Sequence, residues 1–161
     1  MEKGRKLRNI GRGFAWSSRS FSLSVDSMLL MYLTYFCSDT LGLNLGVIGT
    51  MLLVAKVVDG VSNFIFAYLV DNFHFKGGKG RPYEILIIPA WICTFILFGI
   101  PITWKAAVQY AIVFIMYTLI VSVFHTALYC TEPIYLNHAV KEEDRISIQT
   151  VNGIVTTLSF T

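Results

Sequence analysis

Long apolar blocks separated by short polar stretches run along the whole chain. The first begins near Phe21, or at Phe14 if its serine-rich entry is helical, and ends at Cys37. The second covers about Leu45–Val70, and the third runs from after Arg81-Pro82-Tyr83-Glu84 to about Ile102. The fourth runs from Ala106 into the 130s, where Pro133 is expected to bend or end the helix, and the fifth covers Asp144–Thr161. A helix of about 20 apolar residues crosses a bilayer. The pattern therefore predicts an all-α membrane protein with about five transmembrane helices spanning residues 21–161, behind a basic segment at residues 1–20.

Composition supports the same class. The 161 residues are 55% apolar and 14% charged, whereas soluble domains carry about 25% charged residues. This argues against a soluble enzyme, a disordered chain and a secreted disulfide scaffold, and the small net charge of +3 gives no support to nucleic-acid binding. The three cysteines have no paired metal-ligand spacing, so we expect free thiols and no metal centre.

Lysine and arginine are distributed unevenly between the polar stretches. Six lie in residues 1–19, three between the second and third apolar blocks and two between the fourth and fifth, against none and one in the alternate loops. The positive-inside rule then places the N-terminus and both longer loops in the cytoplasm. We expect a multi-pass protein of the inner (cytoplasmic) membrane.

The second block contains three polar residues on one helical face. Lys56, Asp59 and Asn63 follow a spacing of i, i+3 and i+7. Ionisable residues inside a span are costly and mark functional sites by default. A carboxylate and an amide oxygen suit a small hard cation, or the carboxylate alone carries a proton. The alternative is a Lys56–Asp59 ion pair that only makes two buried charges tolerable.

Two other blocks carry candidate substrate contacts. Asp26 lies among serines in the first block, and we expect it to face a cavity, either as a substrate contact or as a helix–helix hydrogen bond. In the fourth block Thr131, Glu132 and Tyr135 surround Pro133, where a freed backbone carbonyl, an acid and an aromatic ring suit a polyhydroxylated ligand. The alternative for Glu132 is solvation at the cytoplasmic end of the helix.

Four motifs resemble one transporter family. They are YLTYFCSDTLGL at residues 32–43, GVIGT at 46–50, AKVVD at 55–59 and KGRPY at 79–83. In order and spacing they are similar to the glycoside-pentoside-hexuronide:cation symporters of the major facilitator superfamily. The resemblance implies twelve helices in two halves, with a sugar and Na⁺, Li⁺ or H⁺ bound between them. This chain would supply most of the N-terminal six-helix half, with the remaining transporter helices as partners.

The resemblance also implies site residues. Lys56 and Asp59 fit the family's cation motif, while Asn63 stands where a second Asp is usual, which makes H⁺ coupling more plausible. The family's acidic residue on its fourth helix corresponds to Thr131, which lies beside Glu132. The family's aromatic residue that stacks on the sugar corresponds to Tyr135. Asp71 and Arg81 match a cytoplasmic gating loop, whereas the family's sugar-binding acid on helix I falls at Leu23 and is missing.

Cation-coupled uptake of a sugar or glycoside by alternating access is thus the expected function, with Na⁺ or H⁺ as coupling ion and no other cofactor. Three alternatives stay open. One is a transporter of the same fold that moves an amphipathic or lipid-like solute, and another is a truncated fragment that does not transport. The third, an intramembrane enzyme, lacks any recognisable catalytic spacing, so no catalytic residues are predicted.

Overall fold

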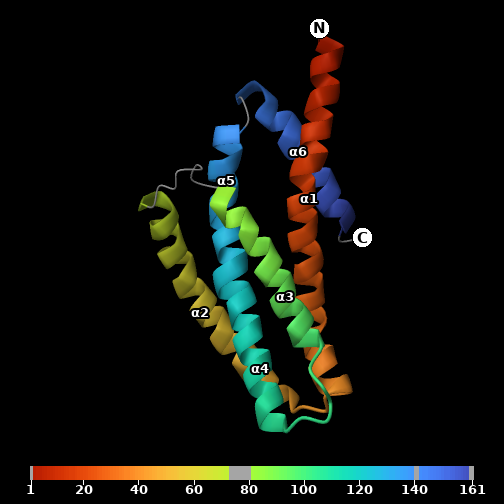
Figure 1. Ribbon diagram of the computed structural model, residues 1–161, viewed down its shortest axis with the longest axis vertical. Coiled ribbons are helices and arrows are strands. Elements are labelled where there is room, and N and C mark those ends of the chain that lie inside the picture. Colours follow the sequence, from red (N-terminus) through yellow and green to blue (C-terminus); the bar gives the residue numbers. More distant parts are fainter. Residues whose placement is uncertain (1, 73–80, 140–141, 160–161) are drawn as a thin grey trace. The chain divides into compact units, whose positions relative to one another are not determined.

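The computed structural model describes residues 2–72, 81–139 and 142–159, with side chains at 14, 16–72, 83–134 and 144–158. Every regular element in these ranges is helical, as predicted (Figure 1). In chain order they are α1 (Glu2–Tyr35), the π-helical turn η1 (Phe36–Thr40), α2 (Leu45–Asn72), the 3₁₀ turn η2 (Arg81–Leu86), α3 (Ile87–Phe98), α4 (Ala106–Leu119), the π-helical turn η3 (Ile120–His125), α5 (Thr126–Ala139) and α6 (Glu142–Ser159).

The chain forms two compact units. One consists of Met1–Met28 with Leu136–Thr161, and the other of Leu29–Tyr135. In the first unit, Ser17, Asp26 and Ile148 are each 1% exposed. In the second unit α4 packs against both α2 and α3, and η3 packs against the same two helices (Figure 1).

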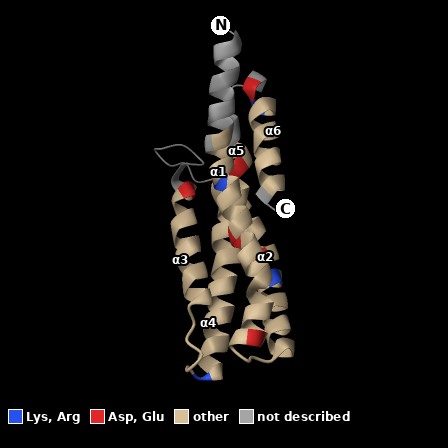
Figure 2. Cartoon of the chain, turned by 90° about the vertical axis from the view of Figure 1, so that its right-hand side faces the viewer, with Lys and Arg blue, Asp and Glu red and all other residues tan. Residues whose placement is uncertain are grey.

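The second unit is built around an apolar core. Leu33, Ile48, Leu97 and Ile120 come from four different elements and are fully buried in it. Large apolar side chains also cover outer faces, such as Phe64 on α2 at 81% exposure. Two stretches, Leu45–Asn72 and Ala106–Ile134, are long and apolar enough to cross a membrane, and Tyr83–Phe98 is a shorter apolar helix. Figure 2 shows how few positions along these helices carry a charge.

The start of α2 agrees with the sequence prediction. The side-chain oxygen of Asn44 accepts hydrogen bonds from the backbone N–H groups of Gly46 at 2.8 Å and Val47 at 3.4 Å, which is the geometry of a helix N-cap. The backbone N–H of Asn44 in turn donates to the Tyr110 hydroxyl at 2.7 Å. The same residue therefore begins α2 and ties it to α4.

Three helix limits differ from the sequence prediction. The first helix begins at Glu2 and has no break near Phe21, because the serine-rich entry is helical. The third ends at Phe98 rather than Ile102, since Gly99 terminates it and Pro101 cannot donate a hydrogen bond to continue it. Pro133 does not end its helix, which runs on to Ala139.

The largest departure is a pair of π-helical turns, one at the end of the first predicted span and one inside the fourth. Phe36–Thr40 extends α1, and Ile120–His125 joins α4 to α5 in one continuous rod. Each π-helical turn inserts an extra residue into the helical repeat and is frequently found at functional sites. The second turn lies directly against α2.

Candidate cation site

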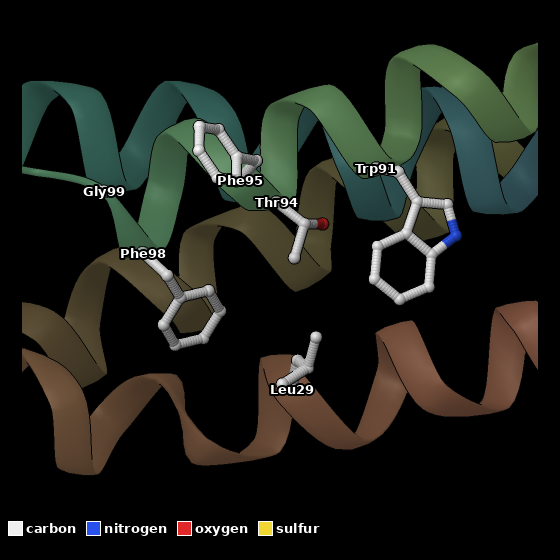
Figure 3. Close-up of a pocket in the computed structure, with 6 residues that line it drawn as sticks. All are labelled: Leu29, Trp91, Thr94, Phe95, Phe98 and Gly99. Carbon is white, nitrogen blue, oxygen red and sulfur yellow. The ribbon is translucent and has the colours of Figure 1, made fainter.

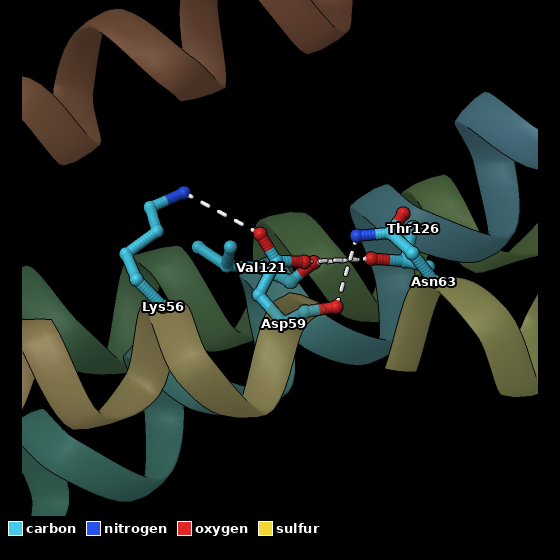
Figure 4. A network of polar contacts seen from close by, with 5 residues as sticks. All are labelled: Lys56, Asp59, Asn63, Val121 and Thr126. Carbon is cyan, nitrogen blue, oxygen red and sulfur yellow. Dashed lines mark hydrogen bonds and ion pairs between the residues drawn. The ribbon is translucent and has the colours of Figure 1, made fainter. Parts of the chain in front are cut away.

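Asp59 on α2 and Thr126 at the start of α5 meet in the middle of the second unit. Thr126 Oγ1 lies 2.9 Å from Asp59 Oδ1 and 3.0 Å from the backbone oxygen of Val121 (Figure 4). The hydroxyl has one proton, so it donates to one of these acceptors at a time. A carboxylate oxygen, a hydroxyl oxygen and a backbone carbonyl thus converge where two apolar spans touch.

Packing of α2 against η3 holds these groups together. Ala55, one turn before Asp59, is fully buried, and Val121 is 7% exposed. The small side chain of Ala55 allows the two helices a close approach. Asp59 is thereby fixed against the π-helical turn while its side chain keeps 20% of its surface exposed.

Lys56 forms the second contact of Asp59. Its Nζ lies 3.6 Å from Asp59 Oδ2, and the Lys56 side chain is 60% exposed. A single ion pair of this exposure contributes little stability. Lys56 thus pairs with one oxygen of the Asp59 carboxylate, and Thr126 donates to the other (Figure 4). Because the ion pair is weak, a cation could replace Lys56 as the counter-ion of Asp59.

Asn63 lies one turn beyond Asp59, as its spacing predicts, but its side chain is turned toward its own helix. The amide nitrogen donates to the backbone oxygen of Asp59 at 2.9 Å. This bond fixes the amide and leaves its oxygen as the atom that a cation would use. Lys56, Asp59 and Asn63 do share a region of α2, but the direct side-chain partner across the helix interface is Thr126.

The residues predicted to contact substrate are distributed over both units. Asp26 belongs to the first unit and is 1% exposed. Thr131 is fully buried in the second, where its hydroxyl donates to the backbone oxygen of Ala127 at 2.9 Å. Glu132 is half-buried, and the side chain of Tyr135 lies outside the described residues.

Of the predicted gating loop, the structure describes both ends, but at the second end it describes only the backbone of Arg81, in η2. Asp71 is exposed at the last turn of α2. Residues 73–80 and the side chain of Arg81 lie outside the described part of the chain.

A separate hollow of about 280 Å³ lies between α1 and α3 (Figure 3). Its lining residues are Leu29, Trp91, Thr94, Phe95, Phe98 and Gly99. The Thr94 hydroxyl already donates to the backbone oxygen of Ala90 at 3.1 Å. With a lining this apolar, the hollow offers few groups to hold a polyhydroxylated ligand.

Sequence comparison identifies the family. Residues 22–160 match the family described as MFS/sugar transport protein. The chain belongs to this family. The match confirms the resemblance to glycoside-pentoside-hexuronide:cation symporters and the assignment to the major facilitator superfamily as an all-α membrane protein.

Curated relatives of this MFS sugar-transport chain carry transporter names. The isoprimeverose transporter of Lactiplantibacillus pentosus is 30% identical over 55% of this chain and 19% of its own length. The putative glycoside/cation symporter YagG of Escherichia coli (strain K12) is 30% identical over 81% of this chain and 26% of its own length. The inner membrane symporter YicJ of the same organism is 27% identical over 67% of this chain and 25% of its own length. The chain thus spans about a quarter or less of these relatives. No solved structure matches it.

Thr126 is not among the residues predicted from the sequence. The family motif points to Thr131 on the same helix, five residues later, because the family has an acid there. The available signal was a hydroxyl next to His125 within an otherwise apolar block, but nothing in the spacing indicates which span it faces.

Proposed function

We propose that this chain forms the N-terminal part of a cation-coupled symporter that takes up a sugar or glycoside by alternating access. The observation that carries the proposal is the 2.9 Å contact between Asp59 Oδ1 and Thr126 Oγ1, which places an ionisable group between two membrane spans. Intramembrane carboxylates are costly and mark ion or proton pathways. The family and the names of its relatives support sugar as the class of solute.

In this proposal Asp59 binds the coupling cation, Na⁺ or H⁺. Thr126 Oγ1 supplies a second oxygen and the Asn63 amide oxygen a third. Lys56 pairs with Asp59 in the absence of the cation, at 3.6 Å, and is released when the cation neutralises the carboxylate. Cation and sugar then each favour the same occluded conformation, so each raises the apparent affinity for the other.

The sugar site belongs to the proposal as well. Asp26, Thr131, Glu132 and Tyr135 are the candidate contacts, with Asp71 and Arg81 as part of the cytoplasmic gate. Thr131 needs a change of hydrogen bond to reach a sugar, because its hydroxyl is engaged by Ala127. Glu132 is half-buried and is therefore our preferred contact. We place the protein in the inner membrane with a cytoplasmic N-terminus, on the distribution of Lys and Arg.

The test is uptake by the full-length protein that carries this chain, reconstituted in vesicles. Isoprimeverose is the first probe, followed by other pentosides, glycosides and hexuronides, with internal pH and Na⁺ recorded together. Sugar-dependent acidification of the vesicle interior would identify H⁺ symport, and sugar-dependent Na⁺ entry would identify Na⁺ symport.

Asp59→Asn is expected to abolish cation-stimulated uptake while the protein still inserts. Asp39→Asn is the matched control, since Asp39 is exposed in the turn after α1. Normal stimulation in Asp59→Asn would refute the cation site. No response to any sugar would refute sugar symport and favour an amphipathic solute.

A further inference from the structure

Several threonine hydroxyls on the described helices donate hydrogen bonds within their own helix. The buried hydroxyls of Thr94 and Thr131 donate to the backbone oxygens of Ala90 at 3.1 Å and Ala127 at 2.9 Å, each four residues back. Thr50, Thr150 and Thr157 make the same bond on exposed faces. This is how a helical hydroxyl normally finds a partner without another chain segment.

Thr118 on α4 and Ser122 in η3 depart from this rule. Both hydroxyl oxygens are buried, and neither has a hydrogen-bond partner among the described residues. Ser122 as a whole is 1% exposed. A buried hydroxyl without a partner is costly, and such a group in a native protein usually binds an ordered water or an ion.

These two residues share one helical face with Thr126. Thr118, Ser122 and Thr126 follow each other at intervals of four residues along the continuous α4–η3–α5 helix. In a regular α-helix the last of them would be rotated about 80° from the first, but the extra residue of the π-helical turn takes back about 100°, so the three side chains stay on one face. Thr126 at the end of this series contacts Asp59 at 2.9 Å (Figure 4). Thr118 lies nearer the Ala106 end, which the charge distribution predicts to be external, about 12 Å from Thr126 at the rise of an α-helix.

We infer that Thr118, Ser122 and Thr126 line a narrow hydrated passage that carries the coupling cation from the external side to Asp59. The inference rests on the proposed symport function. Hydroxyl oxygens replace part of the hydration shell of Na⁺ and equally bind the waters through which a proton travels. The π-helical turn that contains Ser122 interrupts the regular backbone at the point where the passage meets α2.

Two substitutions remove the unsatisfied hydroxyls, Ser122→Ala and Thr118→Val. Each is expected to raise the cation concentration for half-maximal uptake about threefold to tenfold, because one hydrogen bond to the passing water or cation is lost. The maximal rate at saturating cation and the KM for sugar should change less than twofold. Na⁺ is varied at fixed pH, and pH is varied without Na⁺, so that both coupling ions are covered.

The controls separate this role from packing. Thr94→Val is the same chemical change on α3, at a buried hydroxyl that already has its partner, and is expected to leave cation activation unchanged. Thr118→Ser keeps the hydroxyl and is expected to retain wild-type activation. Removing an unsatisfied hydroxyl should also leave the melting temperature in detergent at or above that of the wild type, whereas Thr94→Val should lower it.

The outcomes are distinct. Cation activation that shifts in Ser122→Ala and Thr118→Val but not in Thr94→Val supports the passage. Coupled sugar uptake by the wild type, with all variants activated alike, overturns the passage and leaves the symport function standing. A wild type without coupled sugar uptake overturns both.

Discussion

Replacing Thr126 with valine tests the cation site at its central contact. Valine has nearly the shape of threonine but cannot donate to Asp59 Oδ1, which lies 2.9 Å from the hydroxyl. A hydrogen bond to a charged group contributes about 1.5–3 kcal/mol. We take the lower end, about 1.5 kcal/mol, because Asp59 is 20% exposed and Val121 competes for the same proton. This corresponds to a factor of about ten in an equilibrium constant.

The expected change depends on the coupling ion. If Na⁺ is coupled, Thr126→Val removes one of its oxygen ligands, and about ten times more Na⁺ is needed for half-maximal sugar uptake. If H⁺ is coupled, Thr126→Val removes no ligand of the proton and only frees the carboxylate oxygen that the proton takes, so uptake needs no more H⁺ than in the wild type. One substitution therefore distinguishes the two ions.

Cation activation of sugar uptake in reconstituted vesicles is the assay, with Thr126→Ser as the variant that keeps the hydroxyl. Thr126→Ser should behave as the wild type. If Thr126→Val were inserted at normal levels and showed unchanged activation by Na⁺ in an Na⁺-coupled transporter, or needed more H⁺ in an H⁺-coupled one, the proposed role of the Asp59–Thr126 contact would be refuted.

Two stability predictions concern the frame around the site, and both are measured as thermal unfolding in detergent. Leu97→Ala should destabilise by about 2–5 kcal/mol because Leu97 is fully buried in the core, whereas Phe95→Leu, at an 80% exposed position, should have little effect. Gly42→Ala should cost about 1–2 kcal/mol because Gly42 has φ of +66°, whereas Gly49→Ala, in a helical position with equally open space, should stabilise by about 0.5–1 kcal/mol. Equal effects at the two glycines would refute the backbone-strain argument.

The hydropathy pattern was sufficient to predict the helices and most of their limits. A span must satisfy its backbone within itself, so a long apolar block has essentially one regular structure available. The predicted start of α2 at Leu45 is correct, and the structure explains it, because the amide side chain of Asn44 caps the first free N–H groups of the helix. Gly99 and Pro101 end α3 early, but the hydropathy pattern does not show this because apolar residues continue to Ile102.

The candidate site was predicted only in part, since periodicity finds residues on one helix and not their partners on another. Lys56 and Asp59 were identified correctly as neighbours, and the structure places them 3.6 Å apart. Thr126 is 67 residues further along the chain, and no spacing rule links it to Asp59. That contact depends on which face α4 and α5 turn toward α2.

The face that α5 presents to α2 depends on the π-helical turn at Ile120–His125. An extra residue in the helical repeat rotates everything that follows by about 100°, roughly one residue position of an α-helix. Faces assigned from a regular 3.6-residue period therefore hold on either side of the turn but not across it. Thr126 is the first residue after the turn, and Val121, whose carbonyl its hydroxyl reaches, is the second residue within it. Because the five-residue separation of these two matches the π-helical repeat, the turn itself supplies the acceptor that competes with Asp59 for the Thr126 proton.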